Sequence, residues 1–226
     1  MNPFARHVYL DHNATTPICR AAQQSMRRVE RRFFGNPSAL YRTGHMAREI
    51  LEESRAAVAR ALGVGPTEII FTGCASEANN QVLTMLFERC YPNRRTLIVS
   101  PIEHPSVIAT ARYLEARGAE LRWMRTGPTG IVDMDHYATL LDESVFLVSC
   151  MLANNETGTV QDIARMAAMA HESGILFHSD CVQALGKVPL DLKSLGVDYA
   201  SFSAHKINGP KGIGALYAAP IGGAGA

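Results

Sequence analysis

Helical patterns and short apolar runs alternate along this sequence from residue 43 onward, and this alternation restricts the possible folds most strongly. Apolar residues from Met46 to Leu62 recur at helical spacing between Thr43, an expected N-cap, and Gly63, an expected stop. The same criteria predict further helices over 76–90, 105–117, 135–142 and 162–173. They predict strands over 68–72, 96–100, 121–125, 144–152, 175–179, 199–203 and 213–217. Several of these strands are continuously apolar, as in a sheet covered on both faces, so we expect a doubly wound α/β fold with a mainly parallel sheet.

The chain has 226 residues, which is enough for one sizeable core. We expect residues 1–40 to form an N-terminal arm with the first helix and residues 41–220 to form one large domain. The Gly- and Ala-rich residues 221–226 are expected to form a flexible tail. An exposed helix face is the expected place of four arginines in the arm, Arg27, Arg28, Arg31 and Arg32.

Composition argues against several classes of protein. The net charge is +1, so charge does not favour binding to nucleic acid or to an anionic membrane. The five cysteines are widely spaced and form no CxxC pair, which argues against a disulfide framework and against a zinc site. Residues 1–7 lack a signal-peptide core, and no apolar run reaches the roughly 18 residues of a membrane span. We therefore expect a soluble, cytoplasmic protein without a metal site.

Polar residues follow several of the predicted strands directly, where ligands gather in folds of this class. Each has a local explanation: Ser76 as an N-cap, His104 as a capping or exposed imidazole, Asn155 as part of a turn, Asp180 as a backbone cap. Lys206, taken alone, is best explained as a solvated loop lysine. Together, however, these strand-end residues form a specific chemical set.

That set matches what pyridoxal phosphate requires. The cofactor needs a lysine for its aldehyde, an acid for its pyridine nitrogen, and a helix start with donors for its phosphate. Lys206 supplies an amine whose pKa falls on burial, which allows a Schiff base to form. Asp180 supplies the acid, the segment from Cys74 to Glu77 the helix start, and His104 an imidazole that can cover the ring and exchange protons.

At this point the sequence resembles the class V aminotransferase superfamily, and within it the cysteine desulfurases. The resemblance rests on motifs that occur in the family's order along the chain: residues 9–17 (YLDHNATTP), 35–38 (GNPS), 103–104 (EH), 154–158 (NNETG), 178–183 (HSDCVQ), 203–206 (SAHK) and 209–217 (GPKGIGALY). It implies the large domain of a fold type I pyridoxal-phosphate enzyme, a three-layer α/β/α sandwich with a mainly parallel, mixed sheet.

The resemblance also implies roles for individual residues. Lys206 would hold the cofactor and later move the α-proton of the substrate, and Asp180 would pair with the pyridine nitrogen. Gln183 would contact the ring hydroxyl, His104 would stack on the ring and act as an acid and base, and Asn155 would lie near the substrate carboxylate. The phosphate would be held by the Ala75 amide, Ser76, Ser203 and His205.

Family members take sulfur from L-cysteine and leave L-alanine and a persulfide. The resemblance covers only the large domain of such an enzyme. The small C-terminal domain, with its sulfur-accepting cysteine and substrate-binding arginine, has no counterpart here. We therefore expect an amino-acid substrate and either a homodimer or a heteromer with a chain that supplies the small domain. Two alternatives stay open: another lyase, aminotransferase or epimerase of the superfamily, and a catalytically incomplete binding or scaffold domain.

Two cysteines depart from the family's pattern. Cys74 stands in the helix-start loop where glycine is usual, and Cys181 follows Asp180 where a small residue is usual. Ser76 stands where the family has threonine but keeps the hydroxyl. The family's nucleophilic cysteine matches neither Cys74 nor Cys181 by position.

Overall fold

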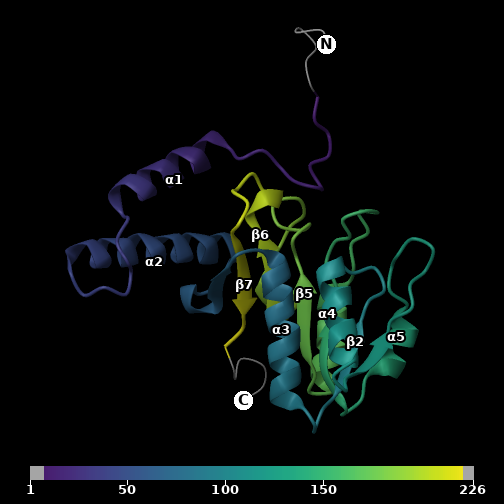
Figure 1. Ribbon diagram of the computed structural model, residues 1–226. Helices are drawn as coiled ribbons and strands as arrows, with labels where there is room; N and C mark the ends of the chain where they lie inside the picture. Colours follow the sequence, from purple (N-terminus) through teal and green to yellow (C-terminus); the bar gives the residue numbers. More distant parts are fainter. Residues whose placement is uncertain (1–7, 221–226) are drawn as a thin grey trace.

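A single sheet forms the centre of the protein (Figure 1). The structure is a computed structural model, which describes residues 8–220. Within that range seven strands pair in the order β1-β7-β6-β5-β4-β2-β3. They are β1 Ile69–Thr72, β2 Thr96–Val99, β3 Glu120–Trp123, β4 Val145–Ser149, β5 Leu176–Asp180, β6 Tyr199–Ser203 and β7 Gly214–Ala218. Only the pairs β1–β7 and β6–β7 are antiparallel. The predicted mixed, mainly parallel sheet is thus confirmed.

Helices cover both faces of the sheet, as the continuously apolar strands predicted. The helices are α1 Arg20–Arg32, α2 Arg42–Leu62, α3 Ala75–Cys90, α4 Pro105–Glu115, α5 Met134–Leu140, α6 Ile163–Glu172 and α7 Leu192–Leu195. Two short 3₁₀ turns, Pro66–Glu68 and Ala204–Lys206, complete the elements. One hydrophobic cluster joins α3 and α4 to one face, and another joins α5, α6 and the end of α2 to the other.

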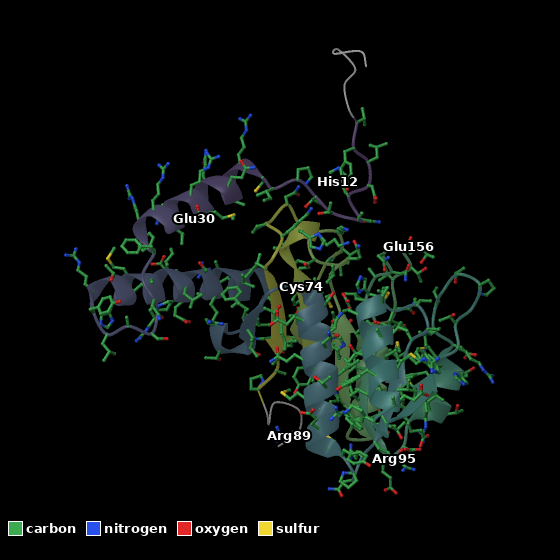
Figure 2. The ribbon with its side chains drawn as sticks, viewed as in Figure 1. His12, Glu30, Cys74, Arg89, Arg95 and Glu156 are labelled. Atoms are coloured by element: carbon green, nitrogen blue, oxygen red, sulfur yellow. The ribbon has the colours of Figure 1, made fainter. Side chains whose placement is uncertain are left out.

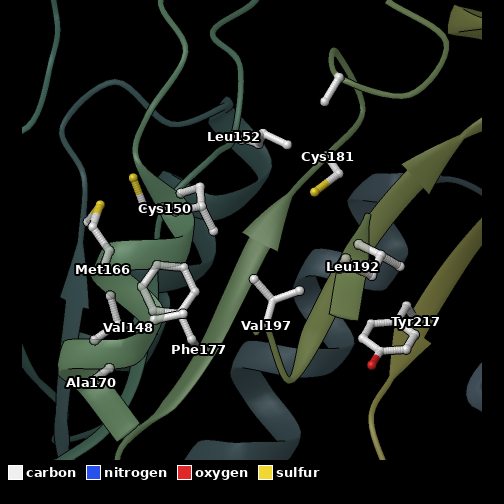
Figure 3. Close-up of a cluster of buried hydrophobic side chains, with 14 of the residues drawn as sticks. Val148, Cys150, Leu152, Met166, Ala170, Phe177, Cys181, Leu192, Val197 and Tyr217 are labelled. Carbon is white, nitrogen blue, oxygen red and sulfur yellow. The ribbon is translucent and has the colours of Figure 1, made fainter. Parts of the chain in front are cut away.

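Alternation along each strand divides the core between these clusters. On β2, Leu97 packs in the cluster of α3 and α4, whereas its neighbour Ile98 packs in the other, and both are fully buried. Figure 3 shows the second cluster, where Phe177 of β5 lies beside Val148 of β4 and faces Met166 of α6. This two-sided burial makes the sheet a rigid platform for the loops at its edge.

The ends of α2 show one prediction confirmed and one wrong. Gly63 ends the helix as predicted, because it adopts a left-handed conformation at φ 71° that glycine tolerates best. Thr43 is not the N-cap, since the helix begins at Arg42 and Tyr41 occupies the cap position. The Tyr41 carbonyl already accepts hydrogen bonds from Gly44 and His45, so the helix starts two residues earlier than an N-cap at Thr43 predicts.

Several other elements differ from their predicted bounds by one or two residues, and two differ more. The strand predicted over 144–152 ends at Ser149, although Cys150 and Leu152 still donate backbone hydrogen bonds to β5. The short helix α7 was not predicted, because its four residues are too few to show helical periodicity. Asp191 is its N-cap, and the carboxylate of this residue accepts hydrogen bonds from the amides of Lys193 and Ser194.

The segment before α1 crosses the edge of the sheet at which β6 ends. Thr16 donates to the His205 carbonyl from both its amide and its hydroxyl, each over 2.8 Å. Cys19 donates from its amide to the Asn208 carbonyl over 2.9 Å.

Among residues 8–220, no helix is long and apolar enough to cross a membrane. The predicted exposed arginine face lies on α1, and the tail predicted at 221–226 falls outside the described residues.

Candidate functional site

A pocket of about 280 Å³ opens where the parallel strands end. Every site residue predicted from the sequence lines it: Ala75, Ser76, His104, Asn155, Asp180, Gln183, Ser203, His205 and Lys206. They come from the ends of β5 and β6 and from the segments that follow β1, β2, β4, β5 and β6, at the edge where ligands bind in such sheets. Figure 2 labels Cys74 at the start of α3, with His12 on the arm above it and Glu156 on the facing loop.

The start of α3 presents backbone amides to the pocket. Cys74 occupies the N-cap position but its side chain makes no capping bond, and Ser76 is the second residue of the helix rather than its cap. The first amides of a helix without a cap carry partial positive charge and bind anions. Ser203, whose hydroxyl group is buried, lines the pocket from β6. These groups form a cradle suited to a phosphate group.

Glycine at position 214 lets β7 approach this cradle. A Cβ atom on Gly214 would lie 2.6 Å from the carbonyl carbon of Cys74 and 2.7 Å from the carbonyl oxygen of Phe202. Both contacts are with backbone atoms, which cannot turn aside as a side chain can. The absence of a side chain at Gly214 therefore allows the α3 start to sit against the sheet.

Asp180 ends β5 with its carboxylate almost fully buried. Its Oδ2 accepts a hydrogen bond of 2.9 Å from Nδ2 of Asn79, and its Oδ1 accepts one of 3.0 Å from the amide of Val182. Burial raises the pKa of Asp180, while the Asn79 hydrogen bond opposes that change. The backbone-cap interpretation is correct for Oδ1, and Asp180 also lines the pocket.

Asn79 is a site residue that sequence reasoning missed. Its Nδ2 also lies 3.0 Å from Oγ of Ser106, so one amide group links the β5 end to the start of α4. The only sequence signal is an asparagine on the apolar face of α3, between Ala75 and Val82, where a buried amide needs partners.

His104 caps α4, as one interpretation of the sequence expected, and it also lines the pocket. Its Nδ1 accepts a hydrogen bond of 3.1 Å from the Ser106 amide, which caps α4, and lies 2.8 Å from the Ser106 hydroxyl. Because Nδ1 is an acceptor, the proton of the neutral ring lies on Nε2. The same side chain lines the pocket and is exposed to solvent.

Lys206 lies in the 3₁₀ turn that follows β6, half-buried against the arm. Its Nζ donates to the carbonyl oxygens of Asn13 and Ala14 over 2.5 and 2.9 Å. Burial lowers the pKa of Lys206, while the negative charges of Asp180, Asp11 and Glu156 raise it. The net effect favours a free amine, the form that reacts with an aldehyde.

One further histidine, His205, and one asparagine, Asn155, also line the pocket. His205 lies with Nδ1 3.1 Å from the Thr15 hydroxyl, and burial together with the charge of Lys206 lowers its pKa. Asn155 donates to Oε1 of Glu156 over 2.6 Å. The turn is instead stabilised by Asn154, whose Oδ1 accepts hydrogen bonds from the backbone amides of residues 156 and 157.

Glu103 is a buried acid just beneath the pocket. Its Oε1 accepts hydrogen bonds from the Ser100 hydroxyl and the Met151 amide, over 2.5 and 2.7 Å. Its Oε2 has no hydrogen-bond partner among residues 8–220. Burial raises the pKa of Glu103 to about 8, so the group is largely uncharged at neutral pH. It connects the loop that carries His104 to the loop that carries Asn155.

The cysteines differ in access to the pocket. Cys74 is half-buried and lines it, whereas Cys181 is fully buried beside Asp180 and has a pKa that burial raises to about 12. A buried, protonated thiol is a poor nucleophile. No group of three or more His, Cys, Asp or Glu side chains within 8–220 is placed to hold a metal ion.

Comparison with known proteins gives consistent matches over nearly the whole chain. The family model described as aminotransferase class-V matches residues 8–221. A cysteine desulfurase of Enterobacter agglomerans is 44% identical over 94% of this chain, and the cysteine desulfurase NifS of Azotobacter vinelandii is 40% identical over 93%. These matches cover 53% and 52% of the two relatives, so the chain spans about half the length of the curated relatives it matches.

Comparison with solved structures also gives matches over nearly the whole chain. A NifS-like protein superposes with a TM-score of 0.92 at 40% identity, over 94% of this chain and 59% of its own. A structure described as SspA in complex with cysteine superposes with a TM-score of 0.90 at 34% identity, over 94% of this chain and 61% of its own.

Proposed function

This chain belongs to the class-V aminotransferase family, and we propose that it carries the pyridoxal-phosphate site of a cysteine desulfurase. The observation that supports this proposal best is that Lys206, Asp180 and the uncapped start of α3 line one pocket. The relatives named cysteine desulfurases support the choice of substrate, which would be L-cysteine. L-Alanine and a persulfide would be the products.

The residues fit a phosphorylated pyridine aldehyde. The buried carboxylate of Asp180 accepts only two hydrogen bonds in the described structure and lines the pocket, where a protonated ring nitrogen would offset the cost of its burial. The start of α3 and Ser203 would hold the phosphate group. Lys206 would hold the aldehyde carbon, because its lowered pKa favours the free amine.

Pyridoxal phosphate, when bound, supplies an electron sink that stabilises negative charge at the α-carbon of an amino acid. Each residue would serve that chemistry in a different way. Asp180 would keep the ring nitrogen protonated, His104 would exchange a proton at Nε2, and Lys206 would move the proton of the substrate's α-carbon. Gln183 would donate to the ring oxygen, and Asn155 would orient the substrate.

The rest of the active protein would come from outside these 226 residues. We propose that a segment corresponding to the other half of the relatives supplies the sulfur-accepting cysteine and the arginine for the substrate carboxylate. The assembly would be a homodimer, or a heteromer with a second polypeptide. A cytoplasmic location accords with the five cysteines, all within residues 8–220 and all free.

Absorption spectroscopy tests the cofactor site. The purified chain, mixed with pyridoxal phosphate, should develop the visible band of lysine-bound cofactor, and borohydride should make the attachment permanent. Lys206→Ala should abolish both effects, whereas Lys211→Ala, at an exposed lysine that does not line the pocket, should leave them intact. A chain that stays colourless with excess cofactor contradicts the proposal.

A second measurement tests the substrate. The cofactor-loaded chain, assayed with proteins encoded beside it and with a thiol reductant that reduces the persulfide, should release alanine and sulfide from L-cysteine. Release of sulfide without alanine, or turnover of other amino acids alone, would favour another lyase, aminotransferase or epimerase of the superfamily. Cofactor binding without any turnover, even with these proteins added, would favour a binding or scaffold domain.

A further inference from the structure

Lys187 makes two side-chain contacts at the edge of the pocket, although no sequence motif singled it out. It lies in the turn after β5, four residues beyond Gln183. Its Nζ donates to Oε1 of Gln183 and, over 2.9 Å, to Oδ1 of Asn13. An exposed lysine that holds two polar groups from segments distant in the sequence has more than a solubilising role.

The contact with Lys187 decides how the Gln183 amide is oriented. An ammonium group has donors only, so the oxygen of the amide must face Lys187 and the NH₂ group must face away. The NH₂ group of Gln183 accordingly donates to the Asn13 carbonyl over 2.9 Å. Because a carbonyl can only accept, both neighbours of the amide require the same orientation. Gln183 is largely buried and lines the pocket, so the side of the amide that faces inward matters.

The same contacts hold the arm against Lys206. The Asn13 carbonyl accepts from Gln183 and also from Nζ of Lys206, over 2.5 Å. Lys187, Gln183, Asn13 and Lys206 therefore form one chain of hydrogen bonds. Burial and the charge of Lys206 lower the pKa of Lys187. Lys187 is the outermost member of this chain and the only one that does not line the pocket.

We propose that Lys187 is a positioning residue: it orients the Gln183 amide with its NH₂ group toward the pocket and anchors the Asn13 turn beside Lys206. The first part rests on the proposed function, because the NH₂ group would donate to the ring oxygen of bound pyridoxal phosphate. Without Lys187 only the Asn13 carbonyl would hold the amide, and the Asn13 turn would itself lose an anchor, so the amide would turn over more readily and present its oxygen to that ring oxygen. Two acceptors would then face each other, which disfavours binding.

Cofactor titrations of the full chain test the orientation. Lys187→Met keeps the length of the side chain and removes its donors, and should weaken pyridoxal-phosphate binding roughly tenfold and shift the absorption band. Lys187→Arg keeps charge and donors and should restore both to near the wild-type values. Lys193→Met, at an exposed lysine of α7, is the matched control and should change neither.

A double variant separates orientation from a general loss of charge. Gln183→Ala removes the group that Lys187 is proposed to orient. Adding Lys187→Met to Gln183→Ala should therefore cost little further affinity, so the two losses should not add. Fully additive losses, or wild-type affinity and spectrum in Lys187→Met, would overturn the orientation.

Hydrogen exchange of the cofactor-free chain tests the anchor without the cofactor. Lys187→Met should speed amide exchange over residues 14–16, while Lys187→Arg should not. Unchanged exchange overturns this part of the proposal. If the wild-type chain fails to bind pyridoxal phosphate, the proposed function fails, whereas faster exchange in Lys187→Met would still support Lys187 as the anchor of the Asn13 turn.

Discussion

Asn79 of α3 and Asp180 of β5 are joined by a hydrogen bond of 2.9 Å that lies beneath the pocket. The same amide nitrogen lies 3.0 Å from Oγ of Ser106, and that oxygen lies 2.8 Å from Nδ1 of His104. Asn79 thus connects the acid and the imidazole of the site through one polar network. Buried networks of this kind are costly to leave incomplete.

Asn79→Ala should therefore destabilise the protein by about 1–3 kcal/mol, because it leaves Oδ2 of Asp180 buried without its donor. It should also weaken pyridoxal-phosphate binding, since the pKa of Asp180 would rise further once the opposing hydrogen bond is lost. Urea denaturation and a cofactor titration measure the two effects. Asn80→Ala, at the exposed neighbouring position, should have a smaller effect on both. Equal effects of the two variants would contradict this prediction.

Glu103 should make stability depend on pH. Burial raises its pKa from the ordinary value of 4.5 to about 8. The folded state therefore binds a proton that the unfolded state has released, and the free energy of unfolding should fall as pH rises from about 4.5 to about 8. The loss approaches roughly 1.4 kcal/mol per pH unit for this one group.

Glu103→Gln should flatten that decline, because glutamine keeps the shape and the acceptor but does not titrate. Denaturation midpoints measured between pH 5 and pH 8 for both proteins provide the check, with Glu115→Gln on the exposed side of α4 as control. If the stability of Glu103→Gln falls with pH as steeply as that of the wild type, Glu103 does not titrate with the raised pKa that its burial implies.

The strand-end residues were predictable from the sequence for a topological reason. Parallel strands place their carboxyl ends at one edge of the sheet, so residues that follow separate apolar runs must lie near one another. His104 and Asp180 are examples, separated by 76 positions in the chain yet connected through Asn79 and Ser106. The helix start that is proposed to bind phosphate was also predictable from the residues, whereas the proposed roles of Gln183, Ser203 and His205 came only from the resemblance to the family.

Contacts of the arm were not predictable in this way. Nζ of Lys206 donates to carbonyl oxygens 193 and 192 residues earlier in the chain. Backbone carbonyls carry no residue-type signal, so nothing in the sequence marks Asn13 as a partner of Lys206. Asn79 and Lys187 were missed for a related reason: each is an ordinary polar residue until its neighbours from other segments are known.

Gly214→Ala should disturb the phosphate cradle and the stability together. The added Cβ would lie 2.6 Å from the carbonyl carbon of Cys74 and 2.7 Å from the Phe202 carbonyl oxygen. Relief of these contacts requires β7 or the α3 start to move, at a cost of about 1–3 kcal/mol. Gly127→Ala is the control, because its Cβ would meet no atom closer than 3.9 Å. Thermal unfolding with and without pyridoxal phosphate measures both effects, and wild-type values for Gly214→Ala would contradict the close approach.

His178 should oppose the effect of Glu103 at acidic pH. It is fully buried in β5 between the hydroxyl groups of Ser149 and Ser201, with its ring nitrogens 2.9 and 3.0 Å away from them. Burial lowers its pKa from 6.5 to about 3. The unfolded state therefore binds a proton that the folded state does not, and the free energy of unfolding should fall as pH drops from about 6.5 toward 3.

His178→Gln keeps a donor and an acceptor for the two serines but removes the titrating group. The substitution should lower the free energy of unfolding at pH 7, because an amide cannot fill the space of the ring. Between pH 6.5 and pH 4, however, the free energy of unfolding of the variant should fall less than that of the wild type. His45→Gln, at an exposed histidine of α2, is the matched control and should leave the acid dependence unchanged. Urea denaturation across this range decides the matter, since an undiminished acid dependence in His178→Gln would assign the loss to other groups.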